Sequence, residues 1–114
     1  MELIRGDTVK YKFRRKNNEG KVIAFKADEI YFTVKENGYT NEVLIKKRLE
    51  DTFDEDYYYH LTINPEDTDD LDYGTYRFDI EVIQDGAKTT VIIDKFIVSE
   101  EITFASDEDS VVSL

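Results

Sequence analysis

The side chains that could perform covalent chemistry are few and widely separated in this chain. His60 is the only histidine, cysteine is absent, and all four serines lie at Ser99 or beyond. A serine nucleophile needs a neighbouring base, so a dyad with His60 would require the C-terminal segment to fold back across the domain. A glycine-rich phosphate loop and a histidine pair for a metal are also missing. We therefore predict no catalytic residue, no cofactor site and no enzymatic activity.

Carboxylates are the abundant reactive group, and they fall in two runs, residues 51–56 and 66–72. A calcium loop of the EF-hand type needs oxygen ligands at alternate positions and glycine at the sixth. Counted from Asp67, Leu71 is fifth and Asp72 sixth, so the pattern fails. An irregular calcium cage and a carboxylate pair for sugar hydrolysis remain alternatives. Solvated acidic loops account for both runs, and we predict no metal site.

The second acidic run has the order of a short helix followed by a strand. Asn64 can cap a helix, Pro65 suits its first position, and carboxylates in the first turn favour the helix dipole. We expect one helical turn near Pro65–Leu71. Asp72, Gly74 and Tyr76 follow, with the spacing of the tyrosine corner of immunoglobulin-like domains. The corner predicts a buried Tyr76 whose hydroxyl bonds to backbone a few residues upstream.

Alternating apolar residues predict about seven short strands and no long helix. The expected strands cover residues 8–14, 21–27, 30–35, 41–49, 57–63, 75–82 and 88–98. Two-residue hairpin turns are predicted at Asn37-Gly38 and at Asp85-Gly86, because these residues tolerate positive φ. The basic run 14–16 is interpreted as a solvated strand end. Together these features predict an all-β, immunoglobulin-like antiparallel β-sandwich.

The last predicted strand is apolar on both faces, which calls for cover by another layer, another subunit or the chain's own tail. Val91, Ile93 and Ile97 are therefore candidate interface residues. Tyr58 joins them because it faces away from the other residues of its tyrosine run. We expect residues 1–99 to form the sandwich, and residues 100–114 to form an acidic tail that is flexible or ordered by a partner.

The charge of the chain is unevenly distributed. Residues 1–49 carry 12 Lys/Arg against 7 Asp/Glu, whereas residues 50–114 carry 3 against 19, and the net charge is −11. This argues against nucleic acid as a partner, and favours either simple solubility or head-to-tail contact between unlike faces of neighbouring subunits. No apolar run approaches the ~20 residues of a membrane span, and no signal peptide is recognised. We expect no membrane contact and synthesis in the cytoplasm.

Two long segments carry a resemblance to a known family. They are HLTINPEDTDDLDYGTYRFDIEVIQDGAKTTVIIDKFIV (residues 60–98) and IRGDTVKYKF with NNEGKVIAFKADEIYFTVK (residues 4–13 and 17–35). Together they resemble immunoglobulin-like domains of phage and prophage tail modules, and are closest to the N-terminal domains of baseplate upper proteins. The resemblance spans residues 3–98 and is most specific over residues 62–80.

The resemblance implies a non-enzymatic structural protein of a phage particle, associated with the tail or baseplate and made in the bacterial host cytoplasm. Its partners would be other virion proteins and further copies of itself. The longer relatives continue into helical linkers, so a stand-alone accessory protein also fits. Two other functions stay open: a carbohydrate or receptor binder that uses Tyr58, and an acidic mimic of nucleic acid based on residues 50–114.

Overall fold

The protein is mostly β in the part of the chain that the computed structural model describes, residues 1–24, 27–50 and 53–100. These residues form nine strands and one short helix. The elements are β1 Glu2–Ile4, β2 Val9–Phe13, β3 Arg15–Lys16, β4 Val22–Ile23, β5 Glu29–Lys35, β6 Val43–Leu49, β7 Tyr59–Ile63, α1 Pro65–Thr68, β8 Gly74–Gln84 and β9 Ala87–Ser99. The predicted β class is confirmed. The predicted tail, apart from Glu100, lies outside the described residues.

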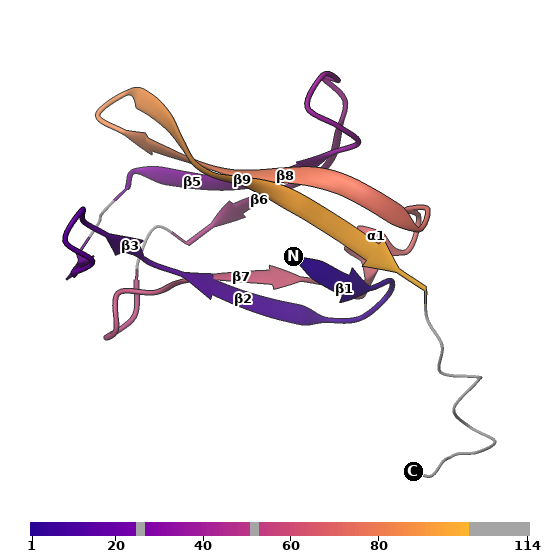
Figure 1. Ribbon diagram of the computed structural model, residues 1–114, viewed down its shortest axis with the longest axis horizontal. Coiled ribbons are helices and arrows are strands. Elements are labelled where there is room, and N and C mark those ends of the chain that lie inside the picture. The colour runs from indigo at the N-terminus through magenta and orange to yellow at the C-terminus, as the bar shows by residue number, and fades with distance from the viewer. Residues whose placement is uncertain (25–26, 51–52, 101–114) are drawn as a thin grey trace, which may run out of the picture.

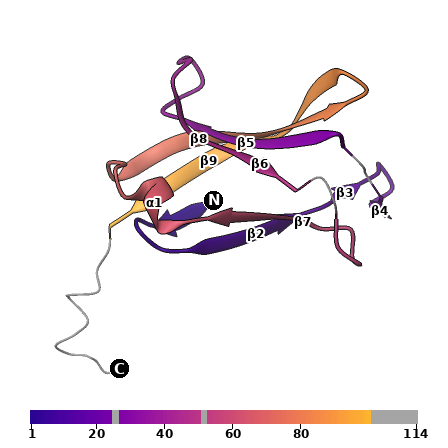
Figure 2. The ribbon, with the colours of Figure 1, turned by 180° about the vertical axis from the view of Figure 1, so that it is seen from behind.

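The strands form two layers (Figures 1 and 2). A curled five-stranded sheet has the order β1-β9-β8-β5-β6, and the two-stranded sheet β2-β7 lies across one of its faces. Strands β3 and β4 form a separate small ribbon. Strand β1 runs parallel to β9, whereas the other pairs are antiparallel. The prediction of a purely antiparallel fold of about seven strands is therefore wrong in count and in this one pairing.

The core fills the space between the two layers. Alternate residues of β5, β8 and β9 point inward, so that the Phe32 ring lies 5.5 Å from Phe78 and 6.0 Å from Phe96 between centroids. The smaller sheet contributes Tyr59, whose ring stacks on Phe13 at 5.6 Å. Strands β2, β7 and β8 follow the period of two expected when one sheet face is buried. The buried apolar residues are Leu3, Ala27, Ile30, Phe32, Val34, Ile45, Leu49, Tyr59, Leu61, Ile63, Phe78, Ile80, Val82, Phe96 and Val98.

The two predicted hairpin turns had different outcomes. Asp85 and Gly86 have φ of 52° and 79° and join β8 to β9 directly, as predicted. Residues 36–42 separate β5 from β6, so the two-residue turn at Asn37-Gly38 is wrong. There the Asn37 side-chain oxygen accepts hydrogen bonds from the Tyr39 and Thr40 amides, at 2.8 and 3.1 Å. This side-chain turn replaces the backbone turn and gives a longer loop.

Strand β9 is not buried on both faces. Phe96 and Val98 are buried, but Val91 is 39% exposed and Ile93 is 61% exposed. The pairing with β8 shifts between Ile80 and Glu81, so that Val91 has no cross-strand partner. Such a bulge redirects side chains and bends the strand. The first half of β9 therefore offers apolar surface to solvent, and only the second half belongs to the core.

Candidate interaction site

The tyrosine corner holds the connection between the two layers. Tyr76 lies at the start of β8, and its hydroxyl donates a hydrogen bond to the Asp72 carbonyl oxygen at 2.7 Å. Gly74, with a φ of 153°, allows the chain to bend between them. Tyr76 is half-buried rather than fully buried, and burial followed by the nearby Asp72 charge raises the pKa of its phenol. This contact is structural, and it fixes where β8 enters the five-stranded sheet.

Helix α1 is tied to both layers by side chains. The Asp67 carboxylate accepts a hydrogen bond from the Asn64 amide at 2.6 Å and pairs with the Lys47 ammonium at 2.7 Å. Lys47 comes from β6, on the edge of the larger sheet. The Thr68 hydroxyl accepts a hydrogen bond from the Gly6 amide at 2.9 Å. These contacts hold α1 against its neighbours at one end of the molecule. Asp67 of the acidic run therefore has a structural role.

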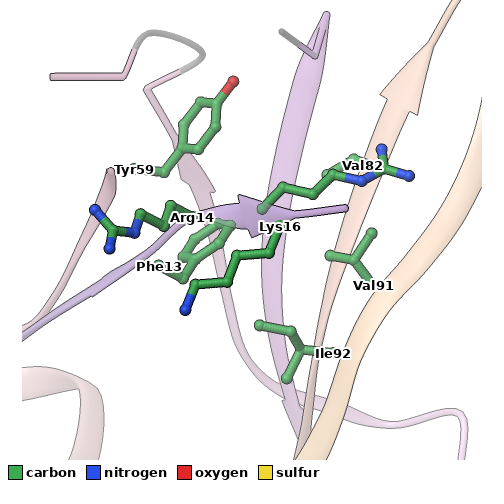
Figure 3. A pocket seen from close by; sticks show the side chains of 8 residues that line it. Phe13, Arg14, Lys16, Tyr59, Val82, Val91 and Ile92 are labelled. Atoms are coloured by element: carbon green, nitrogen blue, oxygen red, sulfur yellow. The ribbon is translucent and has the colours of Figure 1, made fainter. Parts of the chain in front are cut away.

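The opposite end of the molecule contains a groove of about 360 Å³ between the layers (Figure 3). Phe13 and Tyr59 lie on one side of it, and Val91 and Ile92 lie on the other. Its apolar wall is continued by Val82, and its rim carries the basic residues Arg14, Arg15 and Lys16. The sequence interpretation treated the basic run as a solvated strand end. It missed the groove because only the stacking of the two layers brings these residues to the same hollow.

Tyr58 is connected to this groove through Arg14. The Lys12 ammonium and the Arg14 guanidinium each lie 4.4 Å from the centre of the Tyr58 ring. Arg14 also donates a hydrogen bond to the Asp56 carbonyl oxygen at 3.4 Å. Cations held over an aromatic ring are attracted by its quadrupole. A sugar stacking on Tyr58 would have to displace them, which weighs against the predicted carbohydrate platform.

The four candidate interface residues do not form one continuous patch. Val91 lines the groove, and Ile93 is exposed two residues further along β9. Ile97 is half-buried and pairs with Glu2 of β1, so it belongs to the closed edge of the sheet. Tyr58 lies on the β7 side and reaches the groove only through Arg14. The structure therefore joins Val91 with the region of Tyr58, and it separates Ile97 from both.

His60 contacts Asp54, in the loop before β7. Its Nε2 lies 2.7 Å from an Asp54 carboxylate oxygen. The other oxygen of Asp54 accepts hydrogen bonds from the Asp56 and Tyr58 amides, at 2.8 and 3.0 Å. The Tyr58 amide, followed by His60, lowers the pKa of the Asp54 carboxyl. Ser99 donates a hydrogen bond to Glu2 and makes no contact with His60, and the other three serines lie outside the described residues.

Asp79 is half-buried on the outer face of the five-stranded sheet. It pairs with Thr33 of β5 and Ile93 of β9, and one of its carboxylate oxygens is buried without a hydrogen-bond partner. Burial, with the neighbouring Glu81 charge, raises the pKa of the Asp79 carboxyl. Burial disfavours the ionised form of this carboxyl. An ionised Asp79 therefore destabilises the folded state at neutral pH.

Two classes of site are not found in the residues that the structure describes. No group of three or more His, Asp or Glu side chains there is arranged to hold a metal ion. No helix in the same residues is long and apolar enough to cross a membrane. A second hollow, of about 340 Å³, lies along the neighbouring edges of β6 and β7 and includes Lys47 and His60. Known proteins do not narrow the function further, since no family model and no curated protein matches the chain.

Proposed function

We propose that this protein is a non-enzymatic assembly module of a phage or prophage tail or baseplate, acting in the virion through contacts with other tail proteins. The observation that carries the proposal is the apolar surface at the start of β9. Val91 is exposed there in a groove with a basic rim, and Ile93 is exposed on the outer face of the same strand, beside Asp79. Exposed apolar side chains rimmed by polar groups are typical of protein-interaction sites. The phage setting rests on the sequence resemblance over residues 3–98.

The strand connections support an immunoglobulin-like architecture as part of this proposal. Strand β2 pairs with β7, and β8 lies between β5 and β9. In immunoglobulin domains strand B pairs with E, and F lies between C and G. Strand β6, beside β5, takes the place of the added strand of variable-type domains, and Tyr76 lies where the tyrosine corner requires. Within the described residues, the second layer corresponds to the two central strands of such a sandwich.

The test is sedimentation of the purified protein together with pull-down by purified tail proteins encoded beside it. We expect concentration-dependent association, or capture by one of these proteins, which Ile93→Glu should weaken. Tyr39→Glu is the matched control, because Tyr39 is fully exposed on the loop between β5 and β6. A strict monomer at high concentration that no tail protein captures would contradict the proposal.

A further inference from the structure

We infer that the groove receives residues 101–114 of a second copy of the chain, with Ile102 and Phe104 on its apolar wall and the following carboxylates at its basic rim. The inference rests on the proposed function and names the partner in one of its contacts. It assigns a task to a groove that no other described segment occupies. It also pairs three basic residues of the N-terminal half with the acidic C-terminal segment.

The apolar wall of the groove is built for an apolar side chain. Five of its eight lining residues carry large apolar or aromatic side chains, and they come from β2, β7, β8 and β9. A groove of about 360 Å³ accommodates one or two such side chains of a bound segment. In residues 101–114 the sequence Glu-Ile-Thr-Phe-Ala places Ile102 and Phe104 two residues apart. In an extended segment these two side chains share a face.

The charges of the two surfaces are complementary. The rim of the groove carries Arg14, Arg15 and Lys16 in succession. Residues 100–114 contain no lysine or arginine and five carboxylates: Glu100, Glu101, Asp107, Glu108 and Asp109. Opposite charges at the rim of an apolar contact accelerate association and select the partner, although each exposed pair adds little affinity. The acidic group at 107–109 lies three to five residues beyond Phe104, within reach of the rim when Phe104 is bound.

The geometry of β9 requires a second copy for this arrangement. Ile92 lines the groove, and seven residues of strand separate it from Ser99, a distance of about 23 Å. Ser99 ends β9, and the C-terminal end of β9 lies at the α1 end of the molecule (Figure 1). Phe104 follows Ser99 by five residues, which span at most about 18 Å when fully extended. Because the chain must also reverse direction, Ile102 and Phe104 cannot reach the groove of their own molecule.

The experiment is complementation between two full-length variants in sedimentation velocity. Phe104→Asp keeps the groove and disables the bound segment, whereas Val91→Asp keeps the segment and disables the groove. A head-to-tail contact joins unlike surfaces. We expect the wild type to form oligomers, each variant alone to be monomeric, and an equimolar mixture to form dimers only. Raising the salt concentration from 0.05 to about 0.5 M should weaken the wild-type association, because the rim charges are exposed.

A labelled peptide with the sequence of residues 100–114 provides a second measurement. We expect it to bind full-length Phe104→Asp, and to bind at least about tenfold more weakly when Val91→Asp is added. If Val91→Asp fails to fold, as judged by circular dichroism, Arg14→Glu with Lys16→Glu takes its place as the groove variant. Oligomers of unchanged size in Phe104→Asp would overturn the inference and leave the proposed function standing. A monomeric wild type whose melting temperature falls in Phe104→Asp would show intramolecular docking and would also overturn it. A monomer that binds neither the peptide nor any tail protein would overturn both.

Discussion

The Tyr76 hydroxyl stabilises the connection between α1 and β8 through a single hydrogen bond. Its bond to the Asp72 carbonyl oxygen is 2.7 Å long, and the side chain is half-buried. Tyr76→Phe should lower the free energy of unfolding by about 1 kcal/mol, because the Asp72 carbonyl loses its partner. Urea denaturation measures the change. Tyr73→Phe is the control. The Arg5 guanidinium lies over the ring of Tyr73, which this substitution keeps, and Tyr73 is 46% exposed. Equal stability of Tyr76→Phe and the wild type would contradict the corner.

Asp79 gives the protein a pH dependence of predictable sign. Burial raises the pKa of this carboxyl, so the folded protein binds a proton there more tightly than the unfolded chain. Stability from this group therefore increases as the pH falls through the raised folded pKa toward the ordinary value for aspartate. Asp79→Asn should be more stable than the wild type at pH 7, and this advantage should shrink as the pH is lowered through that range.

The measurement for Asp79 is the melting temperature of both proteins across the acidic pH range. Glu42→Gln provides the comparison, because Glu42 is exposed on the loop before β6. Its removal alters net charge by the same amount without relieving a buried carboxylate. If Asp79→Asn and Glu42→Gln gave parallel curves, the burial of Asp79 would have no energetic consequence.

At the scale of elements, α1 is too short to be stable without tertiary contacts. It has four residues, and an isolated helix of that length does not persist in water. Asp67 makes two contacts that stabilise this short helix, one with the Asn64 amide and one with Lys47 of β6. Both side chains of the ion pair are about one-fifth exposed, so solvent screens the pair less than a surface pair.

Asp67→Ala should therefore cost roughly 2 kcal/mol, the sum of a lost helix cap and a broken, partly buried ion pair. Lys47→Met should cost less, because the Asn64 amide keeps its acceptor. Glu66→Ala is the control from the same turn, since Glu66 is exposed. Chemical denaturation of the two single variants and the double variant gives their coupling energy. Additive effects would show that Lys47 and Asp67 do not stabilise the fold together.

At the scale of the whole molecule, the first and last described strands close the sheet together. Strand β1 pairs in parallel with β9, and the Ile97 amide donates a hydrogen bond to the Met1 carbonyl oxygen at 2.8 Å. Leu3 is buried in the core from this strand. An uncovered β9 would present an unpaired edge, which is a template for association between chains. The pairing thus covers the edge of β9 with a strand of only three residues.

Leu3→Ala should lower the free energy of unfolding by about 2–4 kcal/mol, as expected for a core leucine, and should loosen β1 from β9. Hydrogen exchange at the Ile97 amide reports this loosening directly. Val43→Ala is the matched truncation on the other edge strand, and it should be nearly neutral because Val43 is 44% exposed. Slow exchange at Ile97 in Leu3→Ala, with little loss of stability, would show that β1 does not depend on its leucine.

The features that depend on neighbouring residues could be predicted from the sequence. The strand periodicity, the Asp85-Gly86 hairpin, the turn at α1 and the contact of Tyr76 with Asp72 all follow from short-range rules. The Asn37-Gly38 turn failed for an equally local reason, since the Asn37 side chain takes the amides of the next residues. Strand β1 has three residues, too few for a periodic signal.

Which surfaces are exposed depends on long-range packing, and the sequence did not predict it. The bulge at Val91 comes from the long-range pairing of β8 with β9, and it turns an apparently buried strand into apolar surface. The groove exists because the two layers place the end of β2, with its basic run, opposite the apolar side chains of β9, which is distant in sequence. The partial burial of Asp79 likewise depends on the residues that cross-strand pairing places beside it. Register and curvature arise from the sum of many contacts, so no local pattern encodes them.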